Sequence, residues 1–244
     1  MTTFIKAFND NKINILIPLL QRDYVQGGIE SVISPFLDQI FKGSPLDLNY
    51  IYGYDEKSND EKSYFVPIDG QQRLTTLWLL HLYAAAKADK MDEFHTDLLF
   101  NGREFANDFC IALKLNLPKI LLSQTETKKG KLGYVIKDQG WFITSWLSSL
   151  TVRCMLKAID FIHFRFLDES EICSWEKLKS DNCHITFSFL KMDGEAGLDD
   201  DIYIKMNGRG RALSDFENLK SWMDEHAFSE SEIEREAWRL NMDN

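Results

Sequence analysis

The stretch that decides the fold runs from Tyr64 to Leu77 and reads Tyr-Phe-Val-Pro-Ile-Asp-Gly-Gln-Gln-Arg-Leu-Thr-Thr-Leu. Its first five residues are typical of a short buried strand, and a helical apolar spacing begins at Leu74. Residues 69–73, between these two patterns, supply a carboxylate, a glycine, two amides and a guanidinium. Ligands of α/β proteins commonly bind at such a junction, because strand ends and helix amides point into the same crevice. The stretch therefore predicts a strand–turn–helix unit with a concentrated set of polar groups at the turn.

Two interpretations of this junction are open from the residues alone. In the first, Asp69 caps the helix, Gln72 completes a capping-box-like pair at the third helical position, and Gly70 allows the tight turn. Capping leaves Gln71 and Arg73 without a role. In the second interpretation the same residues form a ligand site, which a short motif suggests only as a hypothesis.

The rest of the chain predicts an α+β protein in which a mixed α/β beginning is followed by mainly helical sequence. A short strand at residues 13–17 ends before Pro18 and leads directly into Gln21-Arg-Asp-Tyr24. The remaining predicted elements are a helix at 29–41, strands at 48–54 and 64–68 joined by a polar loop at 55–63, a helix at 71–87, helices with loops at 91–138, one or two buried helices at 141–167 and a strand at 185–190.

A second polar concentration comes late in the chain, at residues 199–220. Gly208 and Gly210 interrupt a short helical pattern, and a capping box at residues 214–217 starts another helix. A helix–turn–helix connection explains the glycines, but Asn207, Arg209 and Arg211 exceed what a turn needs. Arginine suits bidentate contact with phosphate, and glycine lets the backbone approach an anion closely.

Composition excludes several classes of protein. The chain has 244 residues and a formal net charge of −10, whereas a protein that binds nucleic acid over its whole surface is usually basic. No apolar run approaches the ~18 residues of a membrane span, and the first residues do not resemble a signal peptide. The four cysteines form no Cys-x-x-Cys pair, so we expect reduced thiols rather than a zinc site. These features favour a cytoplasmic protein without a membrane partner.

Three blocks in order then resemble the N-terminal domain family of GmrSD-type restriction endonucleases. The first is Ile17-Pro-Leu-Leu-Gln-Arg-Asp-Tyr24, similar to the family's Ile-Pro-x-x-Gln-Arg-x-Tyr, and the second is Asp69-Gly-Gln-Gln-Arg73, the family's signature. The third is Met206-Asn-Gly-Arg-Gly-Arg-Ala-Leu-Ser214. The chain departs from the family pattern at Tyr24-Val-Gln26, where an aromatic residue often follows, and no part of it resembles the His-Asn-His nuclease domain of many relatives.

The resemblance implies a ParB/sulfiredoxin-like core with the Asp-Gly-Gln-Gln-Arg motif at residues 1–90 and a helical extension at 91–244 that closes the site. It also implies binding and hydrolysis of an NTP with Mg²⁺, coupled to restriction of modified foreign DNA by a C-terminal or partner nuclease domain. The catalytic residues carried over are Asp69, Gln71, Gln72 and Arg73, with Asp69 also a candidate Mg²⁺ ligand. The nucleotide-binding residues carried over are Gln21, Arg22, Tyr24, Gly70, Asn207, Arg209 and Arg211.

The chain has no Gly-x-x-x-x-Gly-Lys-Ser/Thr loop, so the implied NTPase is not a P-loop enzyme. Phosphoryl transfer needs mainly positioning and charge neutralisation, which arginines and helix amides supply. Two other classes of function stay open: a module that senses nucleotide or modified DNA without turnover, and a DNA nickase that uses the same polar pocket.

Overall fold

A computed structural model describes residues 1–57, 62–123, 131–168 and 171–192 of the chain. Contacts divide the chain into two compact units, Met1–Ala196 and Gly197–Asn244, and the following account concerns the first. The predicted phosphate-binding loop with Asn207, Arg209 and Arg211 lies outside the described residues.

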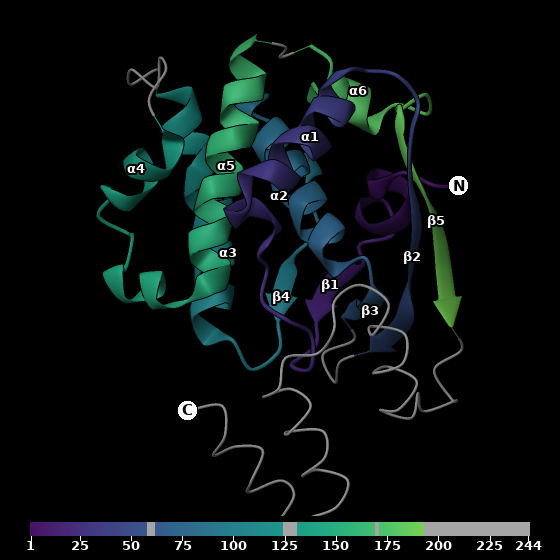
Figure 1. The fold of residues 1–244 in the computed structure, drawn as a ribbon, viewed down its shortest axis with the longest axis horizontal. Helices are drawn as coiled ribbons and strands as arrows, with labels where there is room; N and C mark the ends of the chain where they lie inside the picture. Colours follow the sequence, from purple (N-terminus) through teal and green to yellow (C-terminus); the bar gives the residue numbers. More distant parts are fainter. Residues whose placement is uncertain (58–61, 124–130, 169–170, 193–244) are drawn as a thin grey trace, which may run out of the picture. The chain divides into compact units, whose positions relative to one another are not determined.

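The first unit is built on a five-stranded mixed sheet, with strand order β4-β1-β3-β2-β5 (Figure 1). Its strands are β1 (Asn14–Ile17), β2 (Leu46–Lys57), β3 (Ser63–Asp69), β4 (Leu98–Phe100) and β5 (Ile185–Met192). Strands β1, β3 and β4 run parallel to one another, and β2 and β5 run in the opposite direction. The α+β class predicted from the sequence is confirmed.

The helix α2 (Gln71–Lys87) follows β3 directly and forms the centre of the unit. It is buried around most of its circumference, as expected of a helix covered by other elements rather than one lying at the surface. Helices α3 (Glu104–Leu122) and α5 (Leu150–Asp168) pack against it, and Trp78 donates its indole N–H to the carbonyl of Thr96 at 3.1 Å. The start of α2 is consequently held in place by the core.

The first unit also contains shorter helical elements (Figure 1). They are α1 (Glu30–Phe41), α4 (Leu132–Lys137), α6 (Trp175–Lys179), the π-helix η1 (Ile5–Asn9) and the 3₁₀ segments η2 (Gln26–Gly28), η3 (Met91–Glu93) and η4 (Thr144–Ser148). In η1, Phe8 packs against Phe65 of β3 and Phe189 of β5, so the beginning of the chain covers the sheet. Both α1 and α4 contact α5.

The differences from the predicted elements are local. Strand β2 extends to Lys57, through the start of the predicted loop, because its last residues pair with β3 as far as Ser63. The segment expected to be helical after residue 91 contains the three-residue strand β4, which pairs with β1. We expected the α/β core to occupy residues 1–90, but β4 and β5 come from later in the chain, so the sheet extends beyond that range.

Candidate functional site

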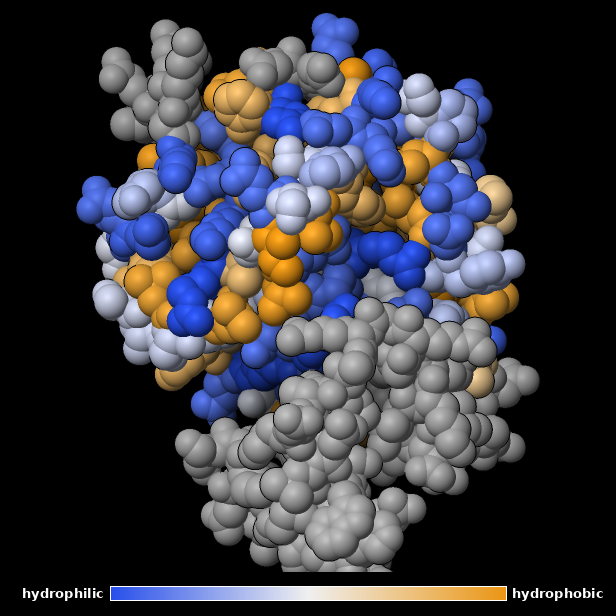
Figure 2. All heavy atoms as spheres, viewed as in Figure 1, coloured by the Kyte–Doolittle hydropathy of each residue, from blue (hydrophilic) through white to orange (hydrophobic). Residues whose placement is uncertain are grey.

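The predicted site residues that the structure describes lie where the three parallel strands end. Strand β1 ends at Ile17, β3 at Asp69 and β4 at Phe100, and parallel strands present their carboxyl ends at one edge. The chain after β4 is tied to the end of β1, because the amide of Asn101 donates to the carbonyl of Ile17 at 2.8 Å. In Figure 2, hydrophilic residues are visible on the part of this lower edge that the grey atoms leave uncovered. We call it the strand-end edge.

The turn that begins α2 depends on Gly70. Its φ of +91° lies in the left-handed region, and it is the N-cap residue of α2, with no side-chain hydrogen bond to cap the helix. A Cβ at this position would also lie 3.0 Å from a side-chain carbon of Ile51. The predicted cap at Asp69 with Gln72 as its capping-box partner is therefore wrong, because Asp69 is the last residue of β3 and both side chains bond elsewhere.

Gln72 holds the loop that follows β1. Its Oε1 accepts hydrogen bonds from the amides of Val25 at 2.9 Å and Gln26 at 3.0 Å, and its Nε2 donates to the carbonyl of Asp23 at 2.9 Å. All of the hydrogen bonds found for this side chain thus go to one segment of backbone. Gln72 joins the first and second predicted blocks, which are about fifty residues apart in the sequence.

Asp69 and Arg73 form an ion pair one helical turn apart, with 3.2 Å between the carboxylate oxygen and the guanidinium nitrogen. The Asp69 side chain is 50% exposed and that of Arg73 25%. The Arg73 guanidinium also donates to the carbonyls of Leu48 and Tyr50, which flank Asn49 at its positive φ of 62°. Arg73 therefore fastens an irregular part of β2 to the start of α2, and Asp69 keeps an open side toward solvent.

Gln21 and Tyr24 face inward from the first block. Gln21 is buried and donates from Nε2 to the carbonyl of Ile68 at 2.7 Å, which ties the loop to the end of β3. The hydroxyl of Tyr24 lies 2.8 Å from that of Thr76 on α2. Burial raises the pKa of Tyr24 well above its usual value, so the hydroxyl remains protonated and available for this hydrogen bond.

Two residues at this edge were missed by sequence reasoning. Arg103, just after β4, donates to the carbonyl of Gln21 and lies 3.5 Å from the carboxylate of Asp23. Thr151 at the start of α5 donates to the same carboxylate at 2.9 Å and accepts the amide of Tyr24 at 3.2 Å. No local pattern marks either residue, because their partners are about eighty and about 130 residues away in the sequence.

Some groups at this edge are left available for a ligand. The amides of Gln71, Gln72 and Arg73 are the first of α2 and have no acceptor among the residues that the structure describes. Arg22 is exposed, and no hydrogen bond or ion pair joins its guanidinium to a described residue. The Gln71 side chain is only 7% exposed, yet it too makes no hydrogen bond within the described ranges. The Gln71 amide is not among the buried unpartnered polar atoms of the described residues, so it reaches solvent and is free to bond a ligand.

The residues at the edge fit Mg²⁺ only when a bound ligand supplies further oxygen atoms to the metal ion. Within the described residues no group of three His, Cys, Asp or Glu side chains is arranged to hold a metal ion. Mg²⁺ commonly combines one or two carboxylates with phosphate oxygens and several waters. Asp69, half-exposed beside the free amides of α2, provides one such carboxylate. These residues therefore fit a Mg²⁺ ion that binds together with a nucleotide.

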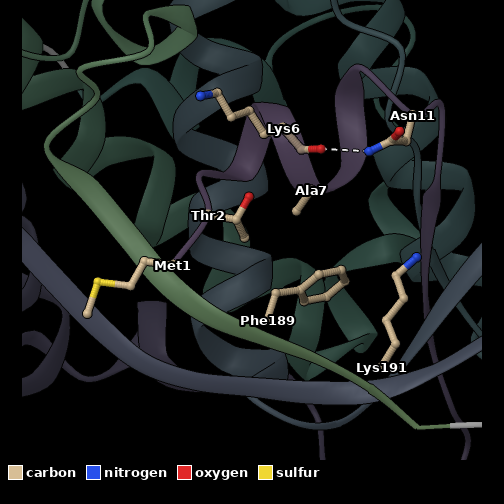
Figure 3. A pocket seen from close by; sticks show the side chains of 7 residues that line it. All are labelled: Met1, Thr2, Lys6, Ala7, Asn11, Phe189 and Lys191. Atoms are coloured by element: carbon tan, nitrogen blue, oxygen red, sulfur yellow. Dashed lines mark hydrogen bonds between the residues drawn. The ribbon is translucent and has the colours of Figure 1, made fainter.

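Two hollows of the described unit lie away from these residues. One of about 320 Å³ lies beside η1 and β5, at the far end of the strand order from β4 (Figure 3). Its two lysines are already paired, Lys6 with Asp181 at 2.8 Å and Lys191 with Asp55 at 2.6 Å. A second, of about 260 Å³, lies between α3 and α4. None of the site residues predicted from the sequence lines either hollow.

Comparison with known proteins agrees with the three sequence blocks. The model of the GmrSD restriction endonuclease N-terminal domain family matches residues 4–223, which include all three. No curated protein and no solved structure matches the chain, so the likeness to ParB and sulfiredoxin folds stays a prediction. Among the described helices none is long and apolar enough to span a bilayer. Since the match covers most of the sequence, the chain belongs to the GmrSD restriction endonuclease N-terminal domain family.

Proposed function

We propose that this chain binds an NTP with Mg²⁺ at the strand-end edge and hydrolyses it, as the N-terminal module of a GmrSD-type restriction system. The family supports the role in restriction. The observation that carries the nucleotide proposal is the set of unused donors at the start of α2, where the free amides and Gln71 lie beside the end of β3. Arg22 follows Gln21, which bonds to the end of that strand. A helix N-terminus of this kind favours phosphate, because its amides and its dipole both attract an anion.

The roles follow from which groups are free and which are already bonded. The amides of α2 and Arg22 bind the phosphate oxygens, and Arg22 neutralises their charge. Gln71 positions the attacking water, since its amide both donates and accepts hydrogen bonds. Asp69 would hold Mg²⁺ as a carboxylate ligand, and its ion pair with Arg73 fixes the direction of that carboxylate.

Gln21, Gln72, Tyr24 and Arg73 act as positioning residues in this proposal. Their hydrogen bonds connect the loop after β1, the bulged part of β2 and the start of α2. A phosphate site must be held rigidly, because a small displacement of positioned groups costs a large fraction of the rate. The phosphate-binding role predicted for Asn207, Arg209 and Arg211 lies outside the described residues and forms no part of this site.

The family also implies partners. A nuclease domain, fused or separate, and DNA belong with a GmrSD-type N-terminal domain. We propose that nucleotide turnover by this chain controls cleavage by that domain and that the DNA substrate is modified foreign DNA. The net charge of −10 fits a module that acts on DNA mainly through its partner.

The test is a phosphate-release assay with the full chain, each of the common NTPs and Mg²⁺, with and without modified DNA. We expect turnover by the parent and a loss of at least about tenfold in Arg22→Ala, which removes a charge-assisted contact. Lys177→Ala is the matched control, because Lys177 is an exposed cation on α6 without a side-chain partner in the described part of the chain. We expect it to retain full turnover.

The outcomes separate the proposal from the other two functions. Nucleotide binding without phosphate release under any condition identifies a sensing module. Divalent-dependent nicking by this chain alone, lost in Asp69→Asn, identifies a nickase. Equal turnover in the parent and Arg22→Ala refutes the proposed phosphate site.

A further inference from the structure

Helix α3 carries an apolar and charged stripe on its outer surface. Its core-facing residues, among them Phe109, Leu113 and Leu117, are buried. A second set of positions follows the alternating three- and four-residue spacing of a coiled-coil seam, and every one of them is exposed or half-buried. We call it the α3 stripe, and its members are Phe105, Asp108, Ala112, Leu115, Lys119 and Leu122.

The apolar members of the α3 stripe are unusually exposed for a helix of this length. Leu115 is 66% exposed, Leu122 45% and Phe105 43%, and Ile111 beside the stripe is 54% exposed. Single exposed apolar residues are ordinary on a protein surface, but a contiguous row at seam spacing is typical of an interaction surface. The charged members, Asp108 and Lys119, form no ion pair with any described residue.

We propose that the α3 stripe binds the α3 stripe of a second copy of this chain, with the two helices antiparallel and a two-fold axis midway between Ala112 and Leu115. Residues equally distant from that axis then face each other. Phe105 meets Leu122 of the second copy, Asp108 meets Lys119, and Ala112 meets Leu115. Every layer of the seam is matched, because apolar residues face apolar residues and the acid faces the base.

The charges select the antiparallel arrangement. In a parallel in-register pair, Asp108 faces Asp108 and Lys119 faces Lys119, so two layers contain like charges. In the antiparallel pair both layers contain opposite charges, one on each side of the two-fold axis. A symmetric dimer requires this self-complementarity, since one surface must serve as both partners.

The length of the stripe predicts a weak dimer. Nineteen helical residues span about 28 Å, and one helix face of that length buries less than the roughly 800 Å² per partner of a standard stable interface. We therefore expect a dissociation constant in the micromolar range, on the order of 10 to 100 µM. The proposal is independent of the nucleotide site, because the charges of the α3 stripe are distinct from those at the strand-end edge.

Sedimentation equilibrium of the full chain from about 1 to 200 µM at low salt tests the proposal. We expect a monomer–dimer equilibrium in the parent. Asp108→Lys and Lys119→Asp each place like charges in two layers, so each is expected to weaken the dimer at least about tenfold. The double variant restores opposite charges with reversed sign, and we expect its dissociation constant to return to within about threefold of the parent's.

Lys157→Asp on the exposed side of α5 is the matched control for a lysine reversal, and it is expected to leave the dimer unchanged. Recovery of dimerisation in the double variant excludes misfolding as the cause of the single-variant effects. A parent that is monomeric throughout overturns the proposal. So does a dimer that neither single reversal weakens, or a double variant no better than the single ones. Each of these results assigns the α3 stripe to another protein or to no partner.

Discussion

The adjacent residues Gln71 and Gln72 are predicted to respond differently to the same substitution, because only Gln72 is hydrogen-bonded. Gln72 makes three hydrogen bonds to the backbone of residues 23–26, at 2.9 to 3.0 Å. At a net contribution of about 1 kcal/mol each, their loss in Gln72→Met lowers the free energy of unfolding by about 3 kcal/mol. For a unit of this size we expect a fall in Tm of roughly 6–12 °C.

Gln71 is buried, whereas Gln72 is half-buried, but Gln71 makes no hydrogen bond within the described ranges. Its amide is not among the buried unpartnered polar atoms of the described residues, so it still reaches solvent. Replacing the amide by the side chain of Met breaks no hydrogen bond, and we expect Gln71→Met to change the free energy of unfolding by less than about 0.5 kcal/mol. The same variant loses NTP turnover, because the group that positions water is gone.

The assay is urea unfolding of both variants and the parent, followed by phosphate release under conditions where each is folded. Equal slopes of the unfolding free energy against urea concentration ensure that the midpoints report stability. Destabilisation of Gln71→Met by 2 kcal/mol or more refutes the reasoning, since it reveals a bonded amide. Full turnover in a stable Gln71→Met refutes the catalytic role.

Three further predictions concern the same region and the core beneath it. Gly70→Ala is expected to destabilise the chain by about 1–2 kcal/mol in urea unfolding, because φ is +91° and the new Cβ meets Ile51 at 3.0 Å; an unchanged midpoint contradicts the assigned turn. Asp69→Asn changes stability by less than about 0.5 kcal/mol, since its ion pair with Arg73 is half-exposed, but raises the Mg²⁺ concentration needed for turnover; an unaltered Mg²⁺ titration argues against Asp69 as a ligand. Burial lowers the pKa of His81 to about 4, below the usual value of 6.5, so the unfolded chain binds more protons between these pH values. The contribution of His81 to the free energy of unfolding is therefore full above pH 6.5 and falls by about 1.4 kcal/mol per pH unit down to pH 4. Urea unfolding at pH 7 and at pH 4.5 measures this fall. The same pH dependence in His81→Gln as in the parent contradicts the assignment to His81.

The parts of the fold that sequence predicted well are those with a long local pattern. The helix expected at residues 71–87 is α2, Gln71–Lys87, because its apolar spacing extends over many turns. The three-residue strand β4 was not predicted, since it has too few residues for a period and forms by pairing with β1. The π-helix η1 was also missed, and its Phe8 is fixed by packing against β3 and β5.

The site was predicted as a set of residues but not as an arrangement. The order of the blocks indicated that Gln21 and Gln72 belong together, yet their hydrogen bonds reach across about fifty residues and no local pattern encodes them. The capping pattern at Asp69 was misleading, because Asp69 is the last residue of β3 and Gly70, at a positive φ, is the N-cap of α2. The unpartnered state of Gln71 follows only from the packed structure.

The central claim is that the strand-end edge binds the phosphates of a nucleotide, and equilibrium binding of a non-hydrolysable NTP analogue with Mg²⁺ tests it most directly. The full chain, Arg22→Ala and Lys177→Ala are titrated by calorimetry at one ionic strength. We predict saturable binding by the parent and by Lys177→Ala, with affinity at least about tenfold weaker in Arg22→Ala, as expected for the loss of a charge-assisted phosphate contact. Equal affinity in all three proteins, or binding by none, contradicts the account.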